Sequence, residues 1–97
     1  MIPIQANQST DECPDNHICF YSEERFLGPM ESREGSAEVV NLKIVARSVK
    51  NCTSAEVFVF TASDGQGKEI RLQAEHSYSI IPGGGAVRSF TGGIVLE

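Results

Sequence analysis

The side chains best suited to chemistry in this sequence are those of two histidines and three cysteines. Neither His17 nor His76 lies in a recognisable nucleophile or metal-binding motif. A cysteine–histidine pair would also need a cysteine that is not held in a disulfide bond. We therefore interpret both histidines as turn or surface residues, and we expect no enzymatic activity.

The cysteines, Cys13, Cys19 and Cys52, allow two kinds of structure. Three cysteines in a short chain are consistent with one disulfide bond and one remaining thiol. A structural zinc site needs four ligands, usually as two closely spaced pairs, whereas this chain has one loose pair. The spacing therefore favours a disulfide bond over zinc, and we expect no metal site.

Two pairs of neighbouring carboxylates, Asp11 with Glu12 and Glu23 with Glu24, are candidates for acid–base work. Neighbours on a strand point to opposite faces of the sheet, which is poor geometry for two groups that must share a proton. We interpret both pairs as solvated charges.

Three consecutive glycines, Gly83, Gly84 and Gly85, resemble a phosphate-binding loop in composition. Such a loop needs a helix after it, because the amino end of the helix holds the anion. Residues 87–90 have the pattern of a strand instead. We therefore interpret the glycines as a flexible turn and expect no cofactor.

Composition limits the partners that this protein can have. A chain of 97 residues is long enough for one domain with a modest core. The net charge of −5 disfavours nucleic acid and anionic membranes, because both attract basic clusters. No apolar run approaches the roughly 18 residues that span a bilayer, and no hydrophobic targeting segment opens the sequence.

We expect a secreted, monomeric protein whose signal peptide is absent from this sequence. Tripeptides that match the N-glycosylation sequon begin at Asn7 and Asn51, and both are compatible with secretion. Residues 1–12 are polar and lack periodicity, so we expect a flexible arm before a single folded domain at residues 13–97.

The rest of the sequence predicts strands and turns. Runs rich in β-branched and aromatic residues alternate with turn-forming clusters, and no long stretch lacks glycine, proline or β-branched residues. The expected strands lie at residues 17–22, 30–33, 39–42, 44–48, 57–60, 70–72, 78–81 and 87–90. This pattern predicts an all-β fold.

The clearest structural motif is formed by Tyr21, Phe26 and Gly28. Their spacing predicts a strand that runs into a folded hairpin. We expect the two rings to stack across the turn, with Gly28 in a backbone conformation that other residues resist. Ser48, on a later strand, is then placed to hydrogen-bond the hairpin backbone.

A weaker copy of this motif follows at Phe60, Gly67 and Ser89, with nearly the same spacing. Each half of the chain is expected to contain four strands, and two such halves predict two Greek keys that pack as a β-sandwich. We place the first Greek key at about residues 17–51 and the second at about residues 55–95.

Two stretches of sequence carry a resemblance to a known family. One is the unit C-P-x-x-x-x-C from Cys13 to Cys19, followed by two aromatic residues, and the other is A-R-S-V before N-x-T at residues 46–53. In these residues the chain resembles the βγ-crystallin superfamily, and most of all the secreted bacterial branch typified by the Streptomyces metalloproteinase inhibitor family. The resemblance covers about residues 13–91. The second half departs from it at Gly65, which replaces the second aromatic residue, so we expect a looser hairpin there.

The resemblance implies a βγ-crystallin-like sandwich with a disulfide bond between Cys13 and Cys19, which leaves Cys52 as a free thiol. The main alternative pairs Cys19 with Cys52, because the first and fourth strands of a Greek key can lie side by side. Many members of the superfamily bind calcium through two Asn or Asp residues shortly before the serine. Here those positions hold residues without a carboxylate, so we expect no tight calcium site; they are Lys43, Ile44, Gly84 and Gly85.

The resemblance also implies a secreted protein that inhibits proteases, in particular metalloproteases, so the expected partner is a secreted protease. The expected mechanism is insertion of a constrained loop that the sandwich holds too rigidly for productive cleavage. Our candidate loop consists of Thr61, Ala62, Ser63, Asp64, Gly65 and Gln66. The alternative, which we favour for these particular residues, is an ordinary hairpin without an inhibitory role. Two glycines, Gly65 and Gly67, predict flexibility there, which would weaken such a mechanism. The alternative is a non-catalytic binding or structural module, such as a toxin, an effector or a surface-binding protein.

Overall fold

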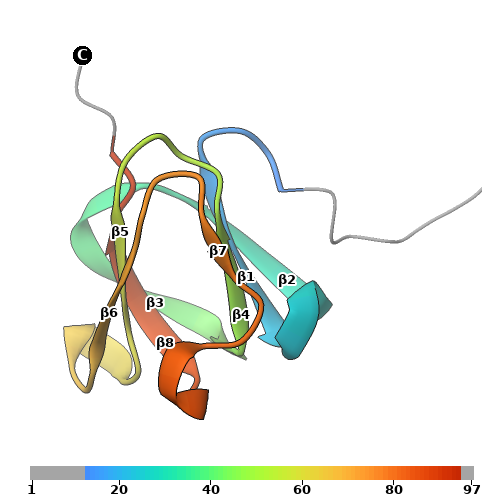
Figure 1. Ribbon diagram of the computed structural model, residues 1–97. Helices are drawn as coiled ribbons and strands as arrows, with labels where there is room; N and C mark the ends of the chain where they lie inside the picture. The colour runs from blue at the N-terminus through green and yellow to red at the C-terminus, as the bar shows by residue number, and fades with distance from the viewer. Residues whose placement is uncertain (1–12, 95–97) are drawn as a thin grey trace, which may run out of the picture.

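The computed structural model describes residues 13–94, which form two four-stranded antiparallel sheets packed as a sandwich (Figure 1). The predicted arm at residues 1–12 lies outside the described residues. The prediction of an all-β sandwich is confirmed. The strands of the sandwich are β1 (His17–Glu23), β2 (Leu27–Glu34), β3 (Ser36–Ala46), β4 (Ser48–Asn51), β5 (Val57–Phe60), β6 (Glu69–Leu72), β7 (Ser77–Tyr78) and β8 (Val87–Gly92). Some of the connections between them contain short 3-10 turns, which are η3 (Glu24–Phe26), η4 (Ser63–Gly65) and η5 (Pro82–Gly84).

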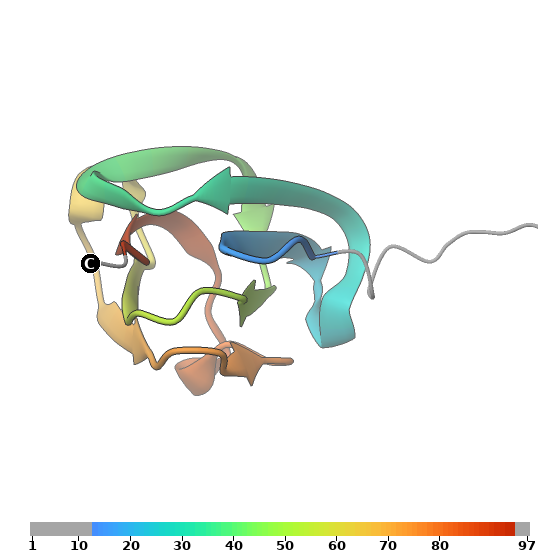
Figure 2. The ribbon, with the colours of Figure 1, turned by 90° about the horizontal axis from the view of Figure 1, so that it is seen from above.

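The two halves of the chain exchange one strand each. One sheet has the strand order β2-β1-β4-β7, and the other has the order β3-β8-β5-β6. The first half therefore contributes β3 to the sheet of the second half, and the second half contributes β7 to the sheet of the first. Figure 2 looks down on the sandwich and shows the long β2–β3 stretch passing from one sheet to the other. Neither sheet is complete without the other half.

The core lies between the two sheets because alternate side chains on each strand point inward. Ile18 and Phe20 point inward from β1, and Val57 and Val59 do so from β5. Phe20 packs against Phe90 of the opposite sheet, with ring centroids 5.1 Å apart. Burial of each such side chain stabilises the folded state by roughly 1.5–3 kcal/mol, so this cluster holds the two sheets together. It also includes Ala46, Val49, Ile70, Leu72, Ile81 and Val87.

The third strand is longer than the sequence predicts. Separate strands are expected at residues 39–42 and 44–48, but β3 continues to Ala46, and β4 begins only at Ser48. The break falls at Arg47, whose N–H donates to the carbonyl of Tyr21 at 2.8 Å. The chain changes sheets at this residue, so Ser48 starts a strand instead of ending one.

A carboxylate holds the irregular part of β3. The pairing of β3 with β8 shifts its register between Asn41 and Ala46. In this stretch the N–H groups of Lys43 and Ile44 donate to Glu31 Oε1, at 2.8 and 3.2 Å. The side chain of Glu31 on β2 therefore takes up backbone donors that the strand ladder leaves without a regular partner.

The seventh strand is shorter than the sequence predicts. Of the expected strand at residues 78–81, only Tyr78 belongs to β7, which begins one residue earlier. The carbonyl of Ser79 instead accepts a hydrogen bond of 2.7 Å from the N–H of Arg25 in η3. Ile81 then enters the core and is 1% exposed. The chain therefore leaves the sheet directly after Tyr78.

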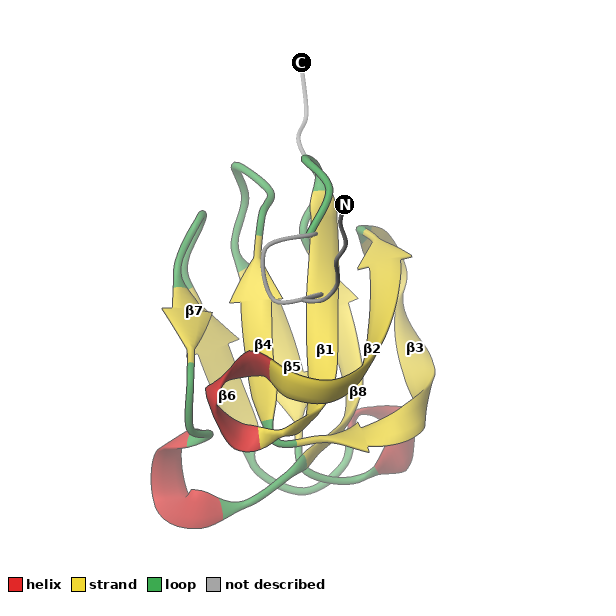
Figure 3. Ribbon diagram, turned by 90° about the vertical axis from the view of Figure 1, so that its right-hand side faces the viewer, coloured by secondary structure: helices red, strands yellow, loops and turns green. Residues whose placement is uncertain are grey.

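The three 3-10 turns lie together at one end of the sandwich (Figure 3). The segment before β1 and the connections from β4 to β5 and from β6 to β7 lie at the opposite end. The molecule therefore has one end formed by the folded hairpins and one end that carries the disulfide bond.

Candidate functional site

The first hairpin is closed by one serine hydroxyl. Ser48 Oγ donates to the carbonyl of Glu23 at 2.6 Å and accepts the N–H of Phe26 at 2.9 Å. The Tyr21 and Phe26 rings meet edge to face, with centroids 5.6 Å apart. Gly28 has a φ of +81°, and a Cβ atom there would lie 2.4 Å from a side-chain oxygen. A residue with a side chain would therefore be strained at this position.

The second hairpin repeats this arrangement. Ser89 Oγ donates to the carbonyl of Ala62 at 2.7 Å and accepts the N–H of Gly65 at 3.1 Å. Gly65 stands where the first hairpin has Phe26. A Cβ atom at Gly65 would lie 3.2 Å from Val39 Cγ2 and 3.9 Å from the Phe60 ring. Val39 on β3 therefore fills the space next to the missing aromatic ring, which the sequence pattern did not indicate.

The candidate loop, residues 61–66, is this second hairpin, and its base is closed by hydrogen bonds. The N–H of Thr61 donates to the carbonyl of Lys68 at 3.1 Å, and the N–H of Lys68 donates to Thr61 Oγ1 at 2.8 Å. Inside the loop, the N–H of Ala62 donates to the carbonyl of Gln66 at 3.2 Å. The N–H of Gln66 donates to the carbonyl of Ser63 at 3.1 Å. The loop is therefore a tightly folded unit.

A residue from the other half of the chain holds the centre of the loop. Asn41 Nδ2 donates to Asp64 Oδ1 at 3.0 Å, and the N–H of Asp64 donates to Asn41 Oδ1 at 2.8 Å. Asn41 lies on β3, the strand that the first half contributes to this sheet. Sequence reasoning missed Asn41 because its contact depends on that strand exchange.

The backbone of the candidate loop is folded and not extended. Asp64 has a φ of +61°, and Gly65 and Gly67 have φ values of +72° and +77°. A Cβ atom at Gly67 would lie 2.4 Å from Thr61 Oγ1. Both glycines, from which the sequence predicts flexibility, adopt left-handed conformations that the hairpin requires. The side chains that remain exposed are those of Ser63, Asp64 and Gln66.

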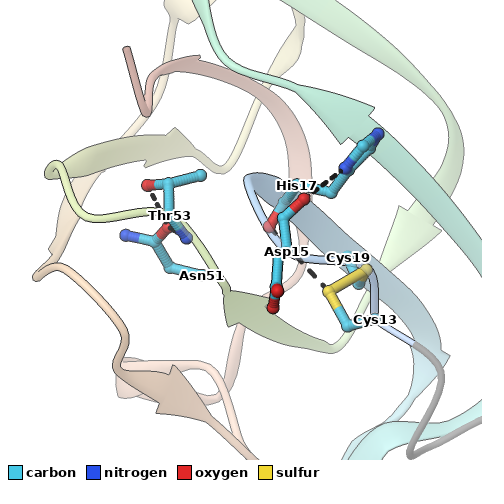
Figure 4. The surroundings of a disulfide bond; sticks show 6 residues. All are labelled: Cys13, Asp15, His17, Cys19, Asn51 and Thr53. Carbon is cyan, nitrogen blue, oxygen red and sulfur yellow. Dashed lines mark hydrogen bonds between the residues drawn. A yellow bond between two sulfur atoms is a disulfide. The ribbon is translucent and has the colours of Figure 1, made fainter. Parts of the chain in front are cut away.

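The opposite end of the sandwich carries the disulfide bond, which joins Cys13 to Cys19 (Figure 4). The alternative pairing of Cys19 with Cys52 does not occur, and Cys52 is a free thiol. The carbonyl of His17 accepts the N–H of Cys52 at 2.9 Å and lies 3.9 Å from Cys13 Sγ. Burial raises the pKa of the Cys52 thiol, so this group is protonated at neutral pH.

Asn51, next to this bridge, is a structural residue. It is 2% exposed, and its Nδ2 donates to the carbonyls of Ala55, Leu72 and Gln73 at 2.9, 3.3 and 3.0 Å. Its Oδ1 accepts the hydroxyl of Thr53 at 2.6 Å. The Asn-x-Thr tripeptide that matches a glycosylation sequon therefore forms hydrogen bonds within a turn. Because the side chain of Asn51 is buried and hydrogen-bonded, it is not accessible for glycosylation.

His17 is the first residue of β1 and is partly buried, so its assignment to a turn is wrong, whereas His76 follows a turn and is exposed. Nδ1 of His17 faces the carbonyl of Asp15 at 3.0 Å, and Nδ1 of His76 faces the carbonyl of Ala74 at 2.8 Å. Within residues 13–94, no three His, Cys, Asp or Glu side chains gather closely enough to hold a metal ion. No helix in the same range is long and apolar enough to cross a membrane.

The positions that the βγ-crystallin resemblance assigns to calcium ligands do not fit that ion. Lys43 and Ile44 direct their N–H groups to the Glu31 carboxylate, and neither side chain has an oxygen. The corresponding pair in the second half, Gly84 and Gly85, has no side chain at all. Calcium needs several oxygen ligands, usually with carboxylates among them.

The sequence from residue 6 to residue 72, more than half of the chain, matches the model of peptidase inhibitor family I36. The chain belongs to this family. The matched stretch includes the disulfide bond, the first hairpin and the whole candidate loop. Membership of family I36 makes the protein a non-enzymatic inhibitor whose partner is a peptidase. No curated protein matches the sequence.

Solved structures show what the fold of this family I36 protein is similar to. It is similar to a structure described as "Evolution of the eye lens beta-gamma-crystallin domain fold", with a TM-score of 0.72, 19% identity and coverage of 88% of this chain and 92% of that one. A βγ-crystallin domain from Clostridium beijerinckii has a TM-score of 0.63, 15% identity and coverage of 80% and 99%. The fifth crystallin domain of the non-lens protein Absent in melanoma 1 has a TM-score of 0.61, 19% identity and coverage of 80% and 87%. These similarities establish a βγ-crystallin fold.

Proposed function

We propose that this family I36 protein is a secreted inhibitor of metallopeptidases and that the candidate loop, residues 61–66, is the part that contacts the enzyme. The observation that carries the proposal is the closure of this loop. Ser89 and Asn41 hold its backbone from two sides, while Ser63, Asp64 and Gln66 remain exposed. A loop that is already ordered loses little conformational entropy on binding, which favours affinity.

The folded backbone also explains how such a loop would resist cleavage. Peptides commonly bind proteins as extended strands that add to the edge of a sheet. The left-handed conformation of Asp64 and the hydrogen bond from Gln66 to Ser63 prevent an extended path through the centre of the loop. The loop would therefore enter the active-site groove as a closed wedge and keep its peptide bonds away from the cleavage geometry.

The other end of the molecule supports a location outside the cell. The bond between Cys13 and Cys19 is typical of proteins that fold in oxidising compartments. A secreted inhibitor would meet secreted peptidases there. The negative net charge disfavours nucleic acid as a competing partner.

The test is a titration of the protein against a thermolysin-type metallopeptidase and, for class selectivity, against a serine peptidase. We expect stoichiometric inhibition of the metallopeptidase, with the inhibitor chain intact by mass spectrometry. Asp64→Ala should raise the inhibition constant about tenfold or more if the loop is central to the contact. Asp15→Ala, an exposed carboxylate at the disulfide end, is the matched control and should leave the constant unchanged. Rapid digestion or no inhibition would favour the non-catalytic binding module.

A further inference from the structure

A second segment, residues 79–84, lies at the same end of the sandwich as the candidate loop (Figures 1 and 3). We name it the Ile80 segment. A Cβ atom added at Gly83 would lie 3.4 Å from Lys68 Nζ, and one added at Gly85 would lie 3.8 Å from Thr61 Cγ2. Lys68 and Thr61 pair with each other at the base of the candidate loop. The end of the Ile80 segment therefore lies beside the base of the candidate loop.

The Ile80 segment is anchored on both sides of its exposed residue. Before it, β7 pairs with β4, and the carbonyl of Ser79 accepts the N–H of Arg25 at 2.7 Å. After it, Ile81 is buried in the core with 1% exposure, and its carbonyl accepts the N–H of Gly84 at 2.8 Å. Both anchors involve residues next to Ile80 in sequence, so the path of the backbone through Ile80 is set.

Ile80 itself is presented to solvent. Its side chain is 46% exposed. Within residues 13–94, neither its N–H nor its C=O makes a hydrogen bond. Single exposed apolar residues are common on protein surfaces. An exposed aliphatic side chain on unpaired backbone between two anchors offers a partner both an apolar contact and strand-like hydrogen bonds.

We propose that Ile80 is the specificity residue of this inhibitor and that its side chain enters an apolar pocket in the active-site groove of the target peptidase. This inference rests on the proposed function, which supplies the peptidase. The candidate loop would fill the neighbouring part of the groove, since Lys68 at its base lies beside Gly83 of the Ile80 segment and Thr61 lies beside Gly85, the next residue after the segment. The anchors at Ser79 and Ile81 reduce the ordering that binding must impose on the segment.

The experiment compares Ile80→Val, Ile80→Ala and Ile80→Ser with the unchanged protein against the same metallopeptidase. We expect the inhibition constant to rise through this series and to reach about tenfold or more for Ile80→Ser. Ile94→Ser is the matched control, because Ile94 is 39% exposed and follows Gly93, whose N–H donates to the carbonyl of Glu56 in the connection from β4 to β5. Because Ile80 is outside the core, all four variants should keep the melting temperature of the unchanged protein within a few degrees.

The outcomes separate this inference from the proposed function. If the unchanged protein inhibits and Ile80→Ser inhibits equally well, Ile80 is not the specificity residue, and the proposed function stands. An equal loss for Ile80→Ser and Ile94→Ser would also overturn the inference. If the unchanged protein inhibits no metallopeptidase, the proposed function fails and this inference fails with it.

Discussion

Asn41 and Asp64 bind each other through two hydrogen bonds, of 3.0 and 2.8 Å, although they belong to different halves of the chain. The exchange of β3 into the second sheet brings Asn41 to the candidate loop. The other half repeats the relationship, since the N–H of Arg25 in the first hairpin donates to the carbonyl of Ser79 after β7. Each hairpin is therefore held by chain from the opposite Greek key.

This relationship predicts unequal effects of two substitutions. Asn41→Ala removes both hydrogen bonds, whereas Asp64→Ala keeps the bond from the backbone N–H to Asn41 Oδ1. We expect Asn41→Ala to lower the free energy of unfolding by about 1 kcal/mol, because the pair is exposed, and Asp64→Ala to lower it less. Urea denaturation of both single variants and the double variant measures the coupling. Additive effects in this cycle would contradict the pairing.

The two serines that close the hairpins should have similar effects on stability. Ser48 and Ser89 are fully buried, and each both donates and accepts a hydrogen bond. Replacement by alanine leaves a backbone N–H and a carbonyl without their partner, so each variant should lose about 1–3 kcal/mol. Ser54→Ala, at an exposed position, is the control. An unchanged denaturation midpoint for Ser48→Ala or Ser89→Ala would be incompatible with this role.

Alanine substitutions at two glycines should distinguish the cost of backbone strain from the cost of a steric clash. Gly67 and Gly84 have nearly the same φ, +77° and +76°. A Cβ atom at Gly67 would lie 2.4 Å from Thr61 Oγ1, whereas one at Gly84 has no neighbour within 4 Å. Both alanine variants should lose about 1 kcal/mol to the left-handed conformation. Gly67→Ala should lose clearly more, and equal thermal midpoints would show that Thr61 moves away without cost.

The free thiol should react slowly and with a marked dependence on pH. Burial raises the pKa of Cys52 above its ordinary value, so less thiolate is present at a given pH than in an unfolded peptide. Alkylation of the native protein by iodoacetamide should therefore be slow at pH 8 and should accelerate as the pH rises through the alkaline range. Peptide mapping without reduction should find Cys52 alone modified. Modification as fast as in a short control peptide would contradict the burial of this thiol.

Reduction provides a related test of the disulfide bond. The bond between Cys13 and Cys19 closes a short loop, so removing it should lower the free energy of unfolding by about 2 kcal/mol. Cys52→Ser should keep the bond and nearly all of this stability. A large loss in Cys52→Ser would mean that Cys52 supports the fold by packing that its half-buried position does not indicate.

Local features of this protein could be predicted from the sequence. Alternating apolar residues and turn-forming clusters predicted an all-β chain, because strand periodicity and turn chemistry depend on residues close together in sequence. The repeated spacing of aromatic, glycine and serine residues predicted two similar halves. The same repeat showed that Phe60 and Ser89 in the second half correspond to Tyr21 and Ser48 in the first half.

The tertiary structure decided which sheet each strand joins, and the features that depend on this choice were not predictable. A single amphipathic strand such as β3 can pair with either half, since its periodicity is the same in both cases. The exchange of β3 places Asn41 and Val39 against the second hairpin. The early end of β7 exposes Ile80 between two anchors. By itself, the sequence determined the strands, the turns and the two hairpins; only long-range pairing decided which residues meet at the end of the sandwich, because such contacts join positions that no local pattern relates.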